Sequence, residues 1–402
     1  MAATPAGPSK AVSITILVVA EIAAMGLWFT SAAVLSDWIA EAGLTPGRAA
    51  LLSSVVQGGF VVGAVLVAVF GLADRFDPRR VVAASTLLAA GANALLLVVP
   101  VGGDLAVLLR ALTGAALAGA YPVGMKIAAG WGLKDRGFLV GLLVGALTLG
   151  TASPHLVAFL GGADWHFTIT VSSIVAACGG LAVLACGLGP WHGRSAAFRP
   201  AAMLKAWTDR RIRFAILGYL GHMWELFALW AWLGAALTAS FATRLPAEEA
   251  LPLSRLVTFL AIGLGGLVCV AGGLMADRIG KVQVTIWAMV LSGGAAILTG
   301  LAFGGPVWLV VLLVLLWGAA VIPDSAQFSA LVADYAPPEE AGTLLTVQTA
   351  LGFLLTLFTV QLLPMAAAAI GWPLALAGLA LGPAFGIAAM VRLLERRRPG
   401  PA

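Results

Sequence analysis

Twelve apolar segments of about 20 residues or more recur along the chain of 402 residues. Each is long enough to cross a hydrocarbon core of about 30 Å as an α-helix. Because lipid offers backbone amides no hydrogen-bond partner, a chain that spans a bilayer in such segments adopts helices there. The sequence therefore predicts an all-α membrane protein with twelve transmembrane helices. They cover residues 11–37, 48–70, 79–100, 104–131, 136–160, 166–189, 212–240, 253–275, 281–302, 306–333, 340–365 and 371–393.

The composition supports a membrane protein and argues against several other classes. Charged residues make up 10% of the chain and apolar residues 61%, whereas soluble domains carry about 25% charged residues. No nucleophile, base and orienting group form a recognisable set, and no phosphate-binding G-x-x-x-x-G-K-[ST] loop occurs. The three cysteines lack the spacing of a metal site. We therefore expect neither enzyme activity, nor a metal or cofactor, nor energy from ATP.

Basic residues indicate the orientation. If the N-terminus is inside, 18 basic residues fall in cytoplasmic segments, and the opposite face has only Arg48, Arg244 and Arg255. The positive-inside rule then places both termini in the cytoplasm, and we expect a bacterial inner membrane location without a cleaved signal peptide. The net charge of +5 reflects this topology rather than nucleic-acid binding. The 18 residues are Lys10, Arg75, Arg79, Arg80, Lys134, Arg136, Arg194, Arg199, Lys205, Arg210, Arg211, Arg213, Arg278, Lys281, Arg392, Arg396, Arg397 and Arg398.

The chain is built twice. Residues 190–211 form the longest polar interruption, and we interpret them as a cytoplasmic linker, with a short interfacial helix near residues 203–207, between halves 1–189 and 212–402. Three features recur in the same order at offsets of 201 to 204 residues: Glu21 and Trp28 as Glu225 and Trp232, residues 72–75 as 275–278, and Pro122 as Pro323. Six helices return the chain to its starting side. The halves should therefore be parallel repeats, an arrangement typical of secondary transporters with a site between the halves.

Several motifs resemble those of the major facilitator superfamily. The run GLMADRIGK at residues 273–281 is similar to its cytoplasmic loop motif G-x-L-a-D-R-x-G-R/K, and FGLADRFDPRR at residues 70–80 lacks both motif glycines. Arg110 followed by Gly114 is similar to the family's R-x-x-x-G motif. The fifth segment resembles an antiporter-associated glycine motif, with Pro154-His155 in place of the final Gly-Pro.

This resemblance implies two six-helix bundles, a proton-coupling role for Arg110, and a latch on the cytoplasmic side. The latch would be formed by the loop residues Asp74, Arg75, Asp277 and Arg278, and Gly273 and Gly280 are the glycines of the loop motif in its second copy.

Ionisable residues inside apolar segments are the candidates for function, because a charge at the bilayer centre costs about 2.5 to 3.5 kcal/mol on insertion scales. Glu225 is the first candidate for a proton carrier, with His222 three residues before it on the same helical face. Glu21 holds the equivalent place, so we expect the two carboxylates to face each other between the halves. Trp28 and Trp232 follow these glutamates by seven residues and could stack on an apolar or cationic ligand.

Other buried polar residues suggest roles beside these. Arg110 suits a substrate carboxylate or an internal acidic partner. Lys126 and Asp324 lie near Pro122 and Pro323, where we expect the helices to bend at an inner gate. When this gate is closed, Lys126 and Asp324 would form an ion pair across the repeat axis. The alternative is that the Lys126 side chain extends to the membrane surface. His155 is interpreted as a helix-end histidine whose hydrogen bonds are satisfied.

These features together favour a secondary active transporter of a small organic solute, coupled to protons, with charges of both signs and aromatic walls at its site. Two alternatives stay open. One is a multidrug or toxic-compound efflux antiporter, and the other is a transport-inactive receptor or subunit that has kept the fold. The sequence is compatible with a monomer whose other partner is the lipid bilayer.

Overall fold

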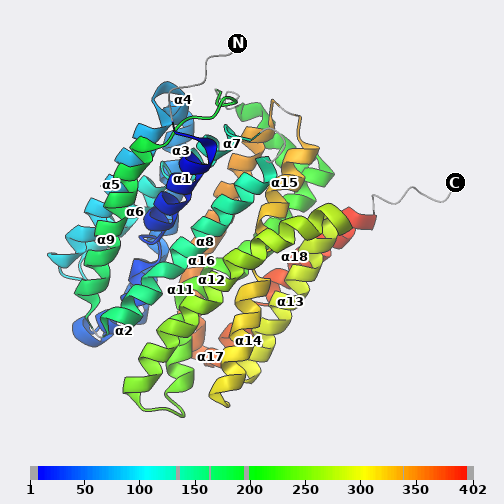
Figure 1. The fold of residues 1–402 in the computed structure, drawn as a ribbon. Helices are drawn as coiled ribbons and strands as arrows, with labels where there is room; N and C mark the ends of the chain where they lie inside the picture. The colour runs from blue at the N-terminus through cyan, green and yellow to red at the C-terminus, as the bar shows by residue number, and fades with distance from the viewer. Residues whose placement is uncertain (1–7, 133–135, 163, 194–198, 338, 396–402) are drawn as a thin grey trace.

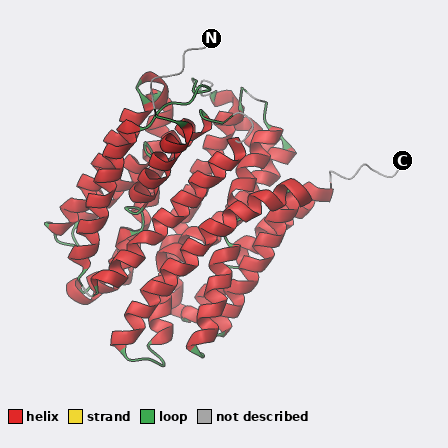
Figure 2. Ribbon diagram, in the orientation of Figure 1, coloured by secondary structure: helices red, strands yellow, loops and turns green. Residues whose placement is uncertain are grey.

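The computed structural model describes residues 8–132, 136–162, 164–193, 199–337 and 339–395, and all regular structure in these ranges is helical (Figure 2). Twelve spans in the described chain are long and apolar enough to cross a membrane. The expected all-α fold with twelve membrane-spanning helices is therefore confirmed. Five of the basic residues used for orientation lie outside the described residues: Lys134, Arg194, Arg396, Arg397 and Arg398.

The spans of the first half are formed by α1 (Lys10–Met25) with α2 (Thr30–Ala42), α3 (Pro46–Phe70), α5 (Pro78–Ala94) with η1 (Leu95–Leu97), α6 (Asp104–Leu117) with α7 (Tyr121–Ala129), α8 (Arg136–Gly161), and α9 (Trp165–Ala182) with η2 (Val183–Ala185). Those of the second half are α11 (Arg210–Phe241), α12 (Ala247–Ile279), α13 (Lys281–Leu301), α14 (Val307–Ala320) with α15 (Ser325–Tyr335), α16 (Ala341–Ile370), and α17 (Trp372–Gly378) with α18 (Leu381–Glu395). Short helices α4 (Leu72–Arg75), η3 (Pro200–Leu204) and α10 (Lys205–Thr208) lie between spans.

An even number of spans brings both ends of the chain to one side of the molecule (Figure 1). We call this side the terminal face; it carries the start of α1, the α4 turn and the end of α18. The opposite, distal face carries the α2–α3 and α11–α12 connections. The halves meet mainly along two helix pairs, α3 with α16 and α8 with α12, and α2 also contacts α11. The expected helix near residues 203–207 is present as η3 and α10.

Repeat-related glycines allow equivalent helix pairs to pack closely. A Cβ atom at Gly114 of α6 would lie 1.9 Å from the carbonyl oxygen of Val56 in α3. A Cβ atom at Gly318 of α14 would lie 2.1 Å from the carbonyl oxygen of Ala261 in α12. The two glycines are 204 positions apart, as are Glu21 and Glu225. The repeat inferred from sequence is thus present in the packing.

Four spans, the first, fourth, tenth and twelfth, each consist of two successive α-helices, and two of these breaks lie at the prolines identified from sequence. The fourth span is interrupted between α6 and α7, with Pro122 in the first turn of α7, where a missing N–H breaks no helical hydrogen bond. The tenth is interrupted between α14 and α15, in the segment that holds Pro323 and Asp324. Interruptions at both prolines agree with the expected bends. The first span also breaks, between α1 and α2, and nothing in the sequence analysis anticipated this.

The two loop-motif copies differ in shape. Gly280 has φ of +96°, a value that favours glycine, so α13 can begin directly after α12 ends. In the first copy Asp77 stands at this place with φ of −59°, and its carboxylate accepts a hydrogen bond from the Arg79 amide at the start of α5. The chain turns earlier here, at Gly71 with φ of +58°. The missing motif glycine is therefore replaced by an aspartate helix cap.

The eighth span begins at Ala247, six residues before the predicted start at residue 253. Arg255 consequently lies inside α12 and is only 3% exposed. Arg255 lies on the distal side, opposite the chain ends, as its place in the basic-residue count predicted, and here the first turns of α12 pack against the first half.

Candidate transport site

The break in the first span is held by Arg110. This fully buried side chain extends from α6 and donates from Nη1 to the carbonyl oxygen of Leu27 at 3.0 Å and from Nη2 to that of Trp28 at 2.6 Å. Nη1 also reaches the amide oxygen of Asn93 at 3.2 Å. Backbone carbonyls freed inside a membrane need such partners. Among the described residues Arg110 thus has only neutral acceptors, and the internal acidic partner considered for it is not found there.

Trp28, presented by this break, belongs to an aromatic layer between the halves. Its ring stacks on Phe353 of α16 with centroids 5.3 Å apart and lies 5.7 Å from Phe227 of α11. Phe60 of α3 lies 4.6 Å from Phe353. We use the term aromatic layer for six residues: Trp28, Phe29 and Phe60 of the first half with Phe227, Trp230 and Phe353 of the second.

Trp232, the repeat equivalent of Trp28, does not join this layer. Its Nε1 donates to the carbonyl oxygen of Val360 at 2.7 Å, within the second half. Of the two tryptophans predicted to stack on a ligand, only Trp28 therefore lies in the aromatic layer between the halves. A small rotation of a helix about its own axis changes which neighbour a side chain faces. The spacing of residues along the sequence does not define that rotation.

Glu225 points into the second half. Its carboxylate accepts from Nε1 of Trp317 in α14 at 2.6 Å and from Oγ of Ser292 in α13 at 2.8 Å. Glu21 points into the first half, where its Oε2 lies against Gly124 of α7, and its Oε1 has no hydrogen-bond partner among the described residues. The expectation that the two glutamates face each other is wrong, because the interface side of both helices is taken by the aromatic layer.

The ion pairs also differ from those expected. His222 Nδ1 lies 3.0 Å from Asp324 Oδ1, so it joins α11 to the break of the tenth span and does not pair with Glu225. Lys126 donates to the Asp74 carboxylate and to the Ala73 carbonyl oxygen at 3.0 Å. This arrangement ties α7 to the α4 turn. Lys126 and Asp324 are thus unpaired with each other in this conformation, since each has a partner in its own half.

His155 was expected at a helix end with all of its hydrogen bonds made. The structure shows neither of these. It lies six residues before the end of α8 and is 1% exposed, and its Nε2 has no partner among the described residues. It faces the second half, where a Cβ atom at Gly234 would be 3.8 Å from its Cε1.

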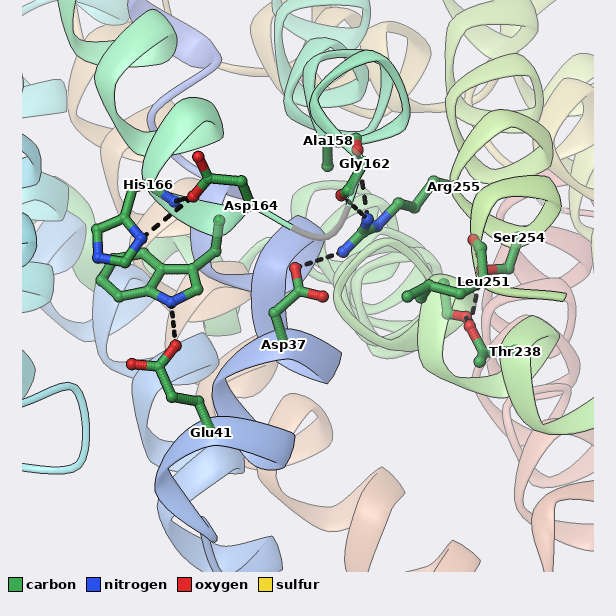
Figure 3. Close-up of polar contacts among 12 residues, drawn as sticks. Asp37, Glu41, Ala158, Gly162, Asp164, His166, Thr238, Leu251, Ser254 and Arg255 are labelled. Carbon is green, nitrogen blue, oxygen red and sulfur yellow. Dashed lines mark hydrogen bonds and ion pairs between the residues drawn. The ribbon is translucent and has the colours of Figure 1, made fainter. Parts of the chain in front are cut away.

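An ion pair joins the halves at the distal face (Figure 3). Arg255 of α12 donates to the Asp37 carboxylate of α2, and its Nη1 also donates to the carbonyl oxygen of Ala158 at 3.3 Å and to that of Gly162, at the end of α8. The two charged side chains are 4% and 9% exposed. This pair was not among the site residues predicted from sequence. An arginine at the third position of the apolar segment predicted at residues 253–275 was the available signal.

The terminal side is arranged differently. The side chains of Arg75, Asp277 and Arg278 form no ion pair with any described residue, and Asp74 is engaged by Lys126 within the first half. The expected latch on the cytoplasmic side is therefore not formed among the described residues in this conformation. A cavity of about 250 Å³ lies between α3, α7 and α16 instead. It extends from Phe60 and Phe353 toward the terminal face.

Comparisons with known proteins agree with this architecture. The family model described as Major Facilitator Superfamily matches residues 16–360. A mutant of the nucleoside transporter NupG superposes with a TM-score of 0.71 at 14% identity, covering 97% of this chain and 100% of that chain. The xylose transporter XylE from E. coli, in a partially occluded inward-open conformation, gives 0.73 at 13% identity, with 97% and 98% covered. A search of curated protein sequences finds no significant match. Because the family model covers most of the chain and the twelve-helix fold is shared, the chain belongs to the major facilitator superfamily of membrane transporters.

Proposed function

We propose that this protein is a secondary active transporter that moves a small organic solute by alternating access between its two halves. The observation that carries the proposal is the asymmetry of the interface. The distal face is bridged by Arg255 and Asp37, whereas the terminal side holds a cavity between the halves. With the terminal face in the cytoplasm, as the basic residues predict, this is the inward-facing stage of such a cycle.

Protons drive this transport, with Glu225 as the carrier. Burying a carboxylate at this depth costs free energy, so its presence there points to a functional role. Its two donors come from different helices, and Trp317 lies four residues before the interruption that contains Asp324. Protonation of Glu225 would weaken both charge-assisted hydrogen bonds and so alter how α14 is held next to its break. Glu21, against α7 at the equivalent break, is the second candidate.

Glutamine substitutions test this coupling. Glu225→Gln keeps an acceptor oxygen for Trp317 and offers Ser292 an amide N–H in place of the second carboxylate oxygen, but it cannot take up or release a proton. In proteoliposomes we expect Glu225→Gln to lose accumulation driven by an imposed pH gradient, by about tenfold or more. Exchange of labelled for unlabelled solute at equal concentration should continue, because it requires no net proton movement. Solutes for this assay are chosen by thermal stabilisation of the purified protein.

Glu21→Gln is measured alongside, and Glu249→Gln, at an exposed position in the first turn of α12, is the matched control. Normal proton-driven accumulation by both interior variants would refute proton coupling through these residues. The direction of flux separates uptake from the efflux alternative: resistance to many toxic compounds on overexpression would favour an exporter. Absence of flux for every bound solute would favour a receptor.

A further inference from the structure

The cavity between the halves has walls without charge. Of the residues that line it, Thr346 and Thr349 are the only ones with polar side chains, and the others are aliphatic, proline or phenylalanine. Its volume of about 250 Å³ is just below the range of about 300–1,000 Å³ that is common for small-molecule sites. A compact molecule of one or two rings is the size that fits.

The inner end of the cavity is the aromatic layer. Phe60 and Phe353 line the cavity and also contact Trp28, with ring centroids 4.7 and 5.3 Å from the Trp28 ring. A solute that enters from the terminal side therefore meets ring faces contributed by both halves. Aromatic faces bind flat, weakly polar surfaces, including the apolar faces of sugars and bases, through stacking.

The charged groups of the interior are turned away from this path. Glu225 is bound by Trp317 and Ser292, and Arg110 is occupied by backbone carbonyls. Glu21 touches Gly124, whereas Pro122 of the same short helix lines the cavity. Two residues along a helix correspond to about 200° of rotation, so the glutamate and the cavity lie on opposite sides of α7. A charged solute would thus lose its hydration without gaining a counter-charge.

Neutral hydrogen-bonding groups, in contrast, are available. The indole Nε1 atoms of Trp28 and Trp230 are buried in the aromatic layer and have no partner among the described residues. Where the halves touch nearby, Gln361 of α16 donates to Ser54 of α3 at 3.0 Å. Buried donors without partners carry a free-energy cost that an acceptor on a ligand would remove.

We infer that the solute is an uncharged, ring-bearing molecule with hydrogen-bond acceptors, which binds by stacking against Phe60 and Phe353 at the inner end of the cavity. This inference rests on the proposed transport function and replaces the earlier expectation of a site with charges of both signs. Sugars and nucleosides are members of this chemical class.

Matched sets of ligands that differ only in charge test the inference. The purified protein is heated with glucose, glucuronate or glucosamine, and with uridine or uridine 5′-monophosphate, at equal concentrations. Ligands that bind the folded state raise its unfolding temperature. We expect stabilisation by at least one neutral member and weaker or no stabilisation by its charged counterparts. Stabilisation by a charged member only, or no stabilisation by either neutral member, overturns the inference.

Substitutions locate the binding site. For the neutral ligand that binds, Phe353→Leu should weaken affinity by about 2- to 10-fold, the range expected for the loss of an aromatic contact. Phe353→Tyr should retain affinity because the ring face is kept. Phe358→Leu, on the same helix but 64% exposed on the outer surface, is the matched control and should bind normally. Equal losses for Phe353→Leu and Phe358→Leu would overturn the assignment.

The inference about the solute and the transport proposal can fail independently of each other. A neutral solute that binds but does not cross proteoliposome membranes would contradict transport and leave this inference intact. A charged solute that is carried across would support transport and contradict the inference.

Discussion

At the scale of single residues, the buried polar side chains form hydrogen bonds and ion pairs with partners that the hydrophobicity of the sequence does not predict. Glu225 is held by an indole and a hydroxyl, Arg110 by backbone carbonyls, and His222 by Asp324. The sequence identified each of these residues as unusual, because a polar group in an apolar helix stands out. It did not identify the partners, since a partner depends on how each helix is rotated about its axis.

Asp77 provides a prediction outside the membrane. Its carboxylate caps α5 and forms an ion pair with Arg79 at 2.6 Å, and this hydrogen-bonded guanidinium lowers the pKa of Asp77 below its ordinary value of 3.8. A group whose pKa is depressed on folding stabilises the folded state above its unfolded pKa, and this contribution is lost as the pH falls through the folded value. Asparagine can still cap the helix.

We therefore expect Asp77→Asn to lower the unfolding temperature slightly at pH 7, with a cost below about 1 kcal/mol because the pair is partly exposed. The difference from the unsubstituted protein should shrink as the pH is lowered past 3.8. Thermal unfolding in detergent between pH 7 and pH 3 measures it. A difference that stays constant over this range would show that the cap geometry, and not the charge, is responsible.

At the scale of helices, close packing and breaks shape the interior. The prolines at the fourth and tenth spans marked two of the breaks in the sequence. The break between α1 and α2 has no proline and is stabilised by Arg110 from another helix. A break supported from outside its own segment leaves no local signal, which is why it could not be predicted.

Glycine substitutions test the helix packing. Gly114→Ala places a methyl group 1.9 Å from the Val56 carbonyl oxygen, so α3 and α6 must separate. We expect a loss of about 1–3 kcal/mol in stability, as for other overpacked cores. It should be measurable as a lower unfolding temperature and a lower yield of folded protein.

Gly91→Ala in α5 is the control, because nothing lies within 4 Å of its added Cβ. Alanine is the better helix former there by up to about 1 kcal/mol, so this variant should be as stable as the original protein or more so. If both alanine variants lose stability equally, helix contact at Gly114 is not the cause.

At the scale of the whole molecule, a buried ion pair joins the two halves at the distal face, and the described residues form no such pair on the terminal side. Removing a partner from such a pair is costly, typically about 3–5 kcal/mol when the remaining charge is buried. Asp37→Asn should therefore weaken the distal closure and shift the conformational equilibrium toward states that are open on that side.

A cysteine at Thr258 reports this shift. Thr258 is fully buried, one turn from Arg255 toward the interior. In a background without the three native cysteines, we expect Asp37→Asn to increase the rate at which an impermeant maleimide added at the distal face labels Thr258→Cys, by about tenfold or more. Asp104→Asn is the control, because Asp104 pairs with Arg48 on the same face but within one half. Unchanged labelling in Asp37→Asn would show that the ion pair does not hold the distal face closed.

The membrane class, the twelve spans, the repeat and the family could all be read from the amino-acid sequence, because hydrophobicity and motifs are local properties that can be summed along the chain. It also identified Glu21, Arg110, Asp324, His222 and Glu225 as interior polar residues. Tertiary structure alone decided that the glutamates point away from each other, that Arg255 joins Asp37, and that the cavity between the halves is uncharged. The orientation of a side chain on a membrane helix depends on the rotation and crossing of that helix. These are set by non-local packing, such as the close approaches at Gly114 and Gly318.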